Sequence, residues 1–510
     1  MNSLRYKMRK ISLVILLPAT VLVTPSAFTQ TSERPVVMTS DQAKQDMMRQ
    51  LGIKTLIAGP SADANAPNAA NYDEAKASPF TSLPDPLVTR SGAKVTNAAQ
   101  WKARRAEIID DYEREVYGRV PRTAPVIKWR VVATDREFVG MKPVIARRVV
   151  GHADNSAYPA ISVDIRMMVV TPADAKGPVP LLVMYGRDDF PAPSPPSRAE
   201  FERIDAALKE TLIAKDAGLR EVFSAHPAFM LQSAPSQFRM PQRDAHGDLP
   251  RPDQVIAAGW GYAMLDTDTI QPDNGASLTQ GVIGLANRGQ PRRPEDWGVL
   301  RAWAWGASRA LDYLVTDPTI DAKRVGVEGV SRYGKAALLA TAFDERFATV
   351  LVGSSGKGGA TLLRRNFGEA VASLASGMHY WMAGNFMKYD TADGPKRLTA
   401  NDLPVDSHEL IALCAPRPVF ISFGIPEQGD AHWLDHRGSL MAAVAAGPVY
   451  RLLGAKPLDV PGDWRTATLP PVNESRLNGT IAWRQHDSGH TDTPNLTIFL
   501  DWARAAMASN

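Results

Sequence analysis

Apolar runs alternate with segments of helical spacing along most of the chain. Short β-branched or aliphatic runs predict strands, and amphipathic stretches between them predict helices. The predicted strands are residues 161–170, 181–185, 261–265, 324–327, the run around Val350, 418–424 and 480–486. The predicted helices are residues 101–117, 197–219, 302–315 and 496–507. This alternation favours a mostly parallel central sheet with helices on both faces, a three-layer α/β sandwich.

Two polar segments interrupt this pattern. Residues 31–85 are rich in Ala, Asn, Pro, Ser and Asp without a sustained period, which predicts an extended tail or linker before a compact domain over 86–510. A proline-rich stretch, about 188–254, separates the second and third predicted strands. A loop of this length is usually functional or an insertion with its own structure. We expect it over the carboxyl ends of the strands, near an active-site entrance.

Composition is that of a globular protein. The chain has 510 residues, of which 44% are hydrophobic and 22% charged, so it can bury a large core in one large domain or two to three smaller ones. Its only cysteine, Cys414, lies in the apolar run LIALCAPRPVF. This excludes an intrachain disulfide and predicts a buried, inert thiol.

The N-terminus has the pattern of a bacterial secretory signal peptide. Four basic residues precede an apolar run over 11–23 and small residues from Ser26. Those basic residues are Arg5, Lys7, Arg9 and Lys10. Because Pro18 and Pro25 interrupt a run already short for a membrane span, removal of residues 1–30 is favoured over a retained anchor. We therefore expect a secreted or periplasmic protein.

Net charge gives no reason to expect a nucleic-acid partner. The formal charge of +4 falls to zero when the four basic residues of the N-terminus are removed with it. The chain has no Lys/Arg stripe and no RNA- or DNA-binding motif. We also expect no stable membrane insertion after cleavage, and a monomer.

The segment RVGVEGVSRYGKAA carries the clearest chemical signal. A β-branched run stops at Gly329, Ser331 follows two residues later, and a helix is expected from Arg332, which is the pattern of a nucleophile elbow. Such a turn exposes the hydroxyl and lets the first helical N–H groups meet an oxyanion. The general elbow has a small residue two positions after the serine, whereas Tyr333 stands there and Gly334 follows. An ordinary turn with a helix-capping serine is the alternative.

The candidate base is His490, in HDSGHTDTP after the last predicted strand and before the closing helix. α/β-Hydrolases place the acid and then the histidine after the serine, which fits this position. His486 lies four residues earlier, so a zinc-binding pair is a rival interpretation. That geometry needs a helix, and the intervening Asp-Ser-Gly argues for a loop.

The candidate acid follows the predicted strand PVFISFG. Glu427 and Asp430 both occur in the next segment, IPEQGDAHWLD, and spacing does not separate them. We expect the nearby Asp435 to cap the helix that begins at His436.

With Ser331, Arg332, Gly334 and Lys335 in GVSRYGK, the chain resembles carbohydrate esterase family 15, the glucuronoyl esterases, whose serine lies in Gly-x-Ser-Arg-x-Gly-Lys. The resemblance covers residues from about 85 to the C-terminus and implies an α/β-hydrolase fold. Other segments similar to bacterial members are EREVYGRVP, PEDWGVLRAWAWGASRALDYLVTDPTIDAKRV, RRNFGE, LPVDSHELIALCAPRPVF and GPVYRLLGAKPL.

The resemblance implies further roles. Arg332 would offer its guanidinium and backbone N–H to the oxyanion, Lys335 and Glu369 would bind sugar hydroxyls, and Trp433 would pack on the sugar ring. Outside the family, Arg332 would be a surface residue, and Trp433 a core residue. Glu369 would form an ion pair with one of the arginines that precede it in RRNFGE, Arg364 or Arg365.

The acid departs from part of the family pattern. Some members carry a glutamate on the strand after the elbow, but the corresponding position, near Ser354, offers no carboxylate. The role therefore falls to Glu427 or Asp430.

The implied activity is that of a serine esterase that cleaves esters of (4-O-methyl-)glucuronic acid, as in cross-links between glucuronoxylan and lignin, without metal or organic cofactor. His490 would deprotonate Ser331, and an acyl-enzyme would follow. The alternatives are an acetyl-xylan or other carbohydrate esterase, and a non-catalytic glycan-binding protein on the same scaffold.

Overall fold

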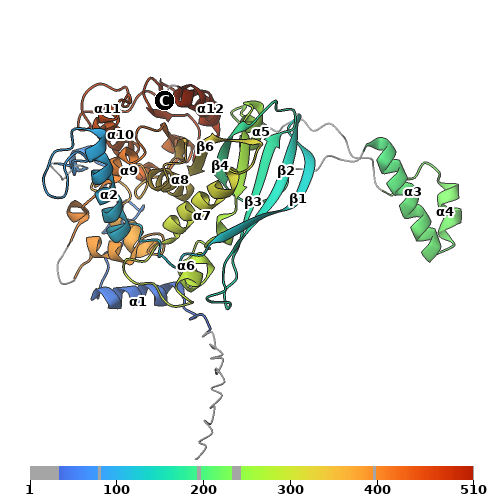
Figure 1. Cartoon of the computed structure of the whole chain (residues 1–510), viewed down its shortest axis with the longest axis horizontal. Helices are drawn as coiled ribbons and strands as arrows, with labels where there is room; N and C mark the ends of the chain where they lie inside the picture. Colours follow the sequence, from blue (N-terminus) through green and yellow to red (C-terminus); the bar gives the residue numbers. More distant parts are fainter. Residues whose placement is uncertain (1–33, 78–81, 192–196, 232–242, 394–397, 509–510) are drawn as a thin grey trace, which may run out of the picture.

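The computed structural model describes residues 34–77, 82–191, 197–231, 243–393 and 398–508 (Figure 1). The expected signal peptide, residues 1–30, lies outside the described residues.

A ten-stranded sheet forms the centre of the molecule, in the order β1-β2-β3-β5-β4-β6-β7-β8-β10-β9. The pairings from β5 through β10 in this order are parallel, and those at the two edges are antiparallel. The strands are β1 Ile127–Val139, β2 Lys142–Ala153, β3 Asp164–Pro172, β4 Val179–Tyr185, β5 Gly261–Leu265, β6 Ile320–Val330, β7 Thr349–Gly353, β8 Val419–Phe423, β9 Ser475–Arg476 and β10 Ile481–Gln485.

Helices cover both faces of the sheet, as the alternating pattern predicted. One apolar core joins the sheet to α2, α7, α8 and α10, and a second joins the other face to α5 and α12. The bounds are α2 Ala98–Glu115, α5 Arg251–Ala257, α6 Gly281–Ala286, α7 Val299–Leu314, α8 Arg332–Phe343, α9 Ser407–Ala412, α10 His436–Ala445, α11 Gly447–Leu452 and α12 Thr493–Ala508.

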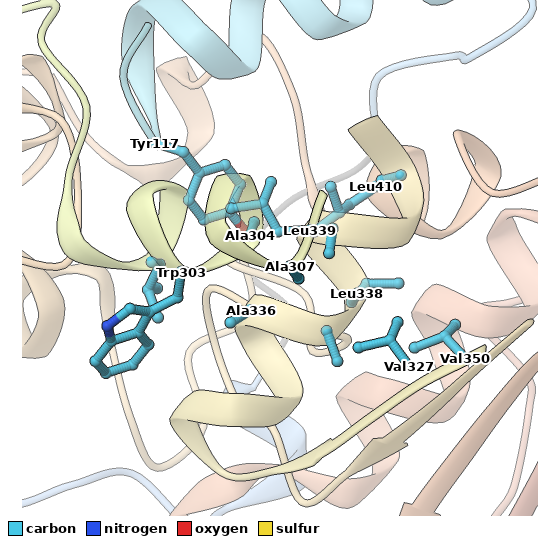
Figure 2. Close-up of a cluster of buried hydrophobic side chains, with 14 of the residues drawn as sticks. Tyr117, Trp303, Ala304, Ala307, Val327, Ala336, Leu338, Leu339, Val350 and Leu410 are labelled. Atoms are coloured by element: carbon cyan, nitrogen blue, oxygen red, sulfur yellow. The ribbon is translucent and has the colours of Figure 1, made fainter. Parts of the chain in front are cut away.

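Small side chains let α8 pack tightly beneath the elbow. Figure 2 shows Ala336 of α8 close to the α7 residues Trp303 and Ala307, with Val327 of β6 and Val350 of β7 below them. Val327 and Val350 are paired in register, so the two strands present a continuous apolar surface to α8. This packing fixes the helix whose first residue follows the candidate nucleophile.

The predicted elements are confirmed with shifts of a few residues at their ends. The strand pair β1–β2 was not predicted, because its exposed and buried positions do not alternate regularly. A two-residue turn joins the pair, and its Gly140 has a φ of 56°, so the Gly-Met dipeptide was a usable hairpin signal.

The segment expected to be an extended tail, 31–85, is folded where the structure describes it. It contains α1, Ser40–Leu51, which begins with a capping box between Thr39 and Gln42. Met47 and Met48 of α1 are buried and join Ile53 in a small apolar cluster with Met387. The polar composition concealed a short amphipathic helix that packs on the main fold.

The insertion also differs from expectation. Its helices α3, Arg198–Lys215, and α4, Leu219–Ala225, are drawn apart from the rest of the fold in Figure 1, on the far side of β1. They are not over the carboxyl ends of β6 to β10. The two ends of the expected insertion contact the body, where Asp188 pairs with Arg148 and Arg251 begins α5.

Cys414 is fully buried, and burial raises the pKa of its thiol to about 11, so the side chain is an inert thiol as expected. Among the described helices, none combines the length and apolar character needed to cross a membrane.

Candidate active site

Ser331 occupies a sharp turn between β6 and α8. Its φ of 61° and ψ of −127° are unusual for a residue with a side chain, which is the strained geometry of an elbow. Its hydroxyl makes no cap hydrogen bond to α8, so the capping interpretation does not describe it. Its N–H donates to the Gly353 carbonyl at 2.8 Å, which ties the turn to β7. The hydroxyl is left available for chemistry.

The two glycines around the serine explain why Tyr333 is tolerated. A Cβ on Gly329 would lie 2.4 Å from the Tyr333 backbone, and a Cβ on Gly334 would lie 2.8 Å from the Gly353 carbonyl oxygen. Close approach of backbones therefore requires glycine at these two positions. The Tyr333 ring stacks on the ring of Tyr185, with the two ring centroids 5.6 Å apart.

His490 and Asp430 are brought together at the ends of neighbouring strands. His490 Nδ1 lies 2.7 Å from Asp430 Oδ1, and the Asp430 carboxylate is fully buried. Because a carboxylate accepts, Nδ1 donates and Nε2 is left as the acceptor. Asp430 follows β8 and His490 follows β10, and both strands run parallel to the β6 strand that ends next to Ser331.

Asp430 is held by two further donors. Ser354 Oγ donates to Asp430 Oδ2 at 2.8 Å, and the Gly424 N–H donates to the same oxygen at 2.7 Å. Glu427, the other candidate acid, is exposed, and within the described residues its side chain makes no hydrogen bond or ion pair. Geometry therefore separates two carboxylates that spacing could not.

His486 has a different environment from His490. Its Nε2 donates to the Thr491 carbonyl at 2.8 Å, and its Nδ1 accepts from the Ser488 N–H at 3.1 Å. Burial lowers the pKa of His486, so the ring is neutral and braces the loop that bears His490. Across the part of the chain that the structure describes, no cluster of His, Cys, Asp and Glu is arranged to hold a metal ion.

The guanidinium group of Arg332 is held by two residues from other parts of the chain, Asp273 and Trp381. Its Nη1 donates to Asp273 Oδ2 at 2.5 Å, and its guanidinium carbon lies 5.2 Å from the centre of the Trp381 ring. The other oxygen of Asp273 accepts from Trp381 Nε1 at 2.6 Å. A guanidinium has five N–H donors, so this pairing leaves others for a substrate.

Lys335 and Glu369 contribute opposite charges to the same cavity. Lys335 is buried and donates to the Ser355 carbonyl, and burial lowers the pKa of its ammonium, an effect that Glu369 opposes. Glu369 Oε2 accepts from the Lys357 backbone N–H at 3.1 Å.

The ion pair with Arg364 or Arg365, which was the alternative role considered for Glu369, is not formed. Arg364 pairs with Asp406 at 3.1 Å, and Arg365 pairs with Asp435 at 2.9 Å. Asp435 also accepts from the Gly438 N–H and caps α10, as expected. Glu369 is thus left facing the cavity beside Lys335.

Ser331, Arg332, Lys335 and Glu369 line one cavity of about 420 Å³. It is lined by Pro60, Ala62, Ala70, Tyr72, Ser331, Arg332, Lys335, Gly368, Glu369, Ser373, Met378, Trp381, Trp433 and Leu434. Trp433 is 40% exposed, so it is a surface tryptophan and not a core residue. A larger cavity of about 800 Å³, near His408 and Trp464, contains none of the catalytic candidates.

The folded N-terminal segment supplies part of the cavity wall. Tyr72 stacks on His432 with ring centres 4.9 Å apart and planes 9° apart. Glu74 pairs with Arg365 at 2.6 Å and with Arg437 at 2.8 Å. This segment takes the place at the cavity that we had expected for the 188–254 insertion.

A buried charge cluster lies behind the site. Arg251 Nη1 donates to Glu328 Oε1 at 2.7 Å and to Asp492 Oδ1 at 3.3 Å. Burial, opposed by Arg251, raises the pKa of Glu328 well above its usual value. Because Glu328 lies on β6 and Asp492 follows His490 by two residues, Arg251 ties the strand of the elbow to the histidine loop.

Asp273, Tyr72 and Arg251 were not predicted from the sequence. Asp273 is in a loop with no pattern of its own, and its partners are far away in sequence. Glu328 is the one acidic residue in the otherwise apolar run 325–330, which was a visible signal, because a buried carboxyl group needs a partner.

Comparisons of sequence and of structure both match this chain to esterases. Residues 292–454 match the family model described as glucuronyl esterase, fungi. A carbohydrate esterase from an unknown prokaryotic organism is 33% identical over 453 residues, which are 87% of this chain and 94% of that protein. A CE15 glucuronoyl esterase from Teredinibacter turnerae superposes with a TM-score of 0.74 and 38% identity, covering 92% of this chain and 99% of the other. A glucuronoyl esterase from Solibacter usitatus gives a TM-score of 0.64 with 30% identity, over 85% of this chain and 100% of the other.

Proposed function

Because the chain belongs to carbohydrate esterase family 15, the glucuronoyl esterases, we propose that it hydrolyses esters of (4-O-methyl-)glucuronic acid, such as those between glucuronoxylan and lignin alcohols. One observation carries this proposal: the cavity of about 420 Å³ combines Ser331 and Arg332 with polar and aromatic groups suited to a sugar. No step of the proposed reaction uses a metal or an organic cofactor.

The first half-reaction forms an acyl-enzyme. His490 Nε2 takes the proton of Ser331 Oγ as that oxygen attacks the C6 carbonyl of the ester, and Asp430 stabilises the imidazolium. The tetrahedral oxyanion is met by Arg332, through its guanidinium and its backbone N–H at the start of α8. The C–O bond to the alcohol then breaks, and the imidazolium returns its proton to the leaving oxygen.

The second half-reaction repeats these steps with water. His490 deprotonates the water, which attacks the acyl carbonyl, and Ser331 Oγ leaves with the proton from the imidazolium. The products are a free alcohol and a glucuronate. Losing either Ser331 or His490 should therefore stop turnover at the chemical step.

Recognition of the uronosyl ring rests on three side chains. Lys335 and Glu369 offer a donor and an acceptor to the ring hydroxyls, and the exposed Trp433 offers an apolar face to its C–H groups. An acetyl ester would use the same serine but would need none of these contacts.

The test compares benzyl glucuronate with acetylated xylan and p-nitrophenyl acetate. We expect a strong preference for the glucuronate ester in the wild type and no turnover in Ser331→Ala, whereas binding of glucuronate to that variant persists. Labelling by a serine-reactive phosphonate should be lost in the same variant. Preference for acetyl esters would replace the proposed substrate class, and a lack of phosphonate labelling in the folded wild type would support a glycan-binding protein.

We further propose that the protein is exported. The basic residues and the apolar run of residues 5–23 support a cleaved signal peptide. Mass spectrometry of the mature protein from a bacterial host should place its N-terminus between about residues 26 and 31. An intact Met1 in the exported fraction would contradict cleavage.

A further inference from the structure

Asp273 is the carboxylate that pairs with the Arg332 guanidinium at the cavity. It precedes the 3-10 helix Gly275–Thr279, which packs against α1. The loop is fixed from within, because the fully buried Gln271 donates to the Ser277 carbonyl at 2.8 Å and accepts from the Ile283 N–H at 3.1 Å. Contacts within the loop therefore fix the position of Asp273, independently of its contacts at the cavity.

Each oxygen of Asp273 serves a different donor. Oδ2 accepts from Arg332 Nη1 and Oδ1 accepts from Trp381 Nε1. The Asp273 side chain is 19% exposed and that of Arg332 is 42% exposed, so solvent screens this pair only in part. A carboxylate fits two donors, whereas an amide at this position would satisfy only one of them.

The charge of the reacting group changes during turnover. The ester is neutral and the tetrahedral oxyanion is negative, so a cation that prefers the oxyanion lowers the barrier. The free uronic acid is a carboxylate at neutral pH, so the same cation also holds the product. An arginine without a counter-charge would bind that product tightly and slow its release.

We propose that Asp273 is a positioning residue that orients the Arg332 guanidinium and, by its negative charge, weakens retention of the carboxylate product. This inference rests on the proposed glucuronoyl esterase activity. It assigns to Asp273 a role in product release that acts through Arg332, since Asp273 itself does not line the cavity.

The test separates charge from shape with two inhibitors. Competitive inhibition constants are measured for glucuronate and for glucuronamide, its uncharged analogue, against benzyl glucuronate in wild type, Asp273→Asn and Asp273→Ala. Removing one partly screened charge should tighten glucuronate binding about fivefold in both variants. The constant for glucuronamide and the KM for the neutral ester should stay within about twofold. The kcat should fall, because the guanidinium is less well oriented and the product leaves more slowly.

Asp268→Asn is the matched control. This exposed carboxylate lies in the 3-10 helix Thr267–Thr269, which precedes Asp273 in the chain, and makes no ion pair among the described residues. Solvent and salt should therefore screen its effect on glucuronate to below about twofold. If both inhibitors bind more weakly in the Asp273 variants, Asp273 is only structural, and an unchanged constant for glucuronate also overturns the inference. If the wild type neither cleaves benzyl glucuronate nor is inhibited by glucuronate, the proposed function itself fails.

Discussion

Replacing Asp430 by asparagine removes one acceptor from a carboxylate that serves three donors. Its oxygens accept from His490 Nδ1 at 2.7 Å, from Ser354 Oγ at 2.8 Å and from the Gly424 N–H at 2.7 Å. The Gly424 N–H cannot reverse its role, so in the Asp430→Asn variant the amide oxygen has to face Gly424 and the amide NH₂ has to face His490. In that orientation Nδ1 becomes the acceptor and the proton moves to Nε2.

A histidine with its proton on Nε2 cannot deprotonate Ser331. We therefore expect kcat for Asp430→Asn to fall by about 10³ to 10⁴, or roughly 4 to 5.5 kcal/mol in the activation barrier, as for other triads with the wrong tautomer. KM should change little, because Asp430 does not line the cavity. The assay is hydrolysis of benzyl glucuronate. For the wild type, titration of Ser331 with the phosphonate gives the concentration of folded enzyme.

Glu427→Gln is the matched control, since Glu427 is exposed and its side chain is unpaired among the described residues. Its kcat should stay within about twofold of the wild type. If Asp430→Asn keeps a tenth or more of the wild-type kcat, or if Glu427→Gln falls as far, the assignment of the acid is wrong.

Three further outcomes are expected. Ser354→Ala should lower kcat about tenfold at constant KM, because Asp430 loses one hydroxyl donor, and an unchanged pre-steady-state acylation rate would contradict this. Trp433→Ala should raise KM for benzyl glucuronate about tenfold but leave p-nitrophenyl acetate unaffected, since only the sugar uses the exposed ring, and equal changes for both substrates would refute that role. His379 is buried with a pKa lowered to about 3, so the folded state binds fewer protons than the unfolded state below pH 6.5 and loses stability as the pH falls. Between pH 7 and 5, the free energy of unfolding measured in urea should fall by about 2 kcal/mol less in His379→Asn than in the wild type. The same dependence of this free energy on pH in both proteins would show that His379 does not contribute.

The arrangement of strands and helices was predictable because the central strands are buried on both faces. The strand before Ser331 and the helix after it follow from a β-branched run, a glycine and an alanine-rich segment, all of which are local signals. Polar edge strands were not predictable in the same way. β1 exposes Val131 and Phe138, so its pattern does not mark a buried side.

The site was predictable only as far as its parts are local in sequence. Ser331, Arg332 and Lys335 come from one turn of helix, whereas the acid depended on which carboxylate the chain buries after β8. Asp430 can be buried because its carboxylate accepts hydrogen bonds from the Gly424 N–H and the Ser354 hydroxyl. The spacing of residues along the sequence predicts neither contact. Asp273 reaches Arg332 across 59 residues, a distance over which composition and periodicity carry no information.

Because the segment before residue 85 is folded, the folded protein begins closer to the expected cleavage site than to residue 86. A shortened gene that begins at the compact domain expected from residue 86 would still encode Ser331, His490 and Asp430. It would lack Tyr72 and the ion pairs of Glu74, and its cavity would be open to water on one side. Purification tags and fusion partners are therefore best joined at the C-terminus or directly after the proposed cleavage site, so that no residue from α1 onward is lost.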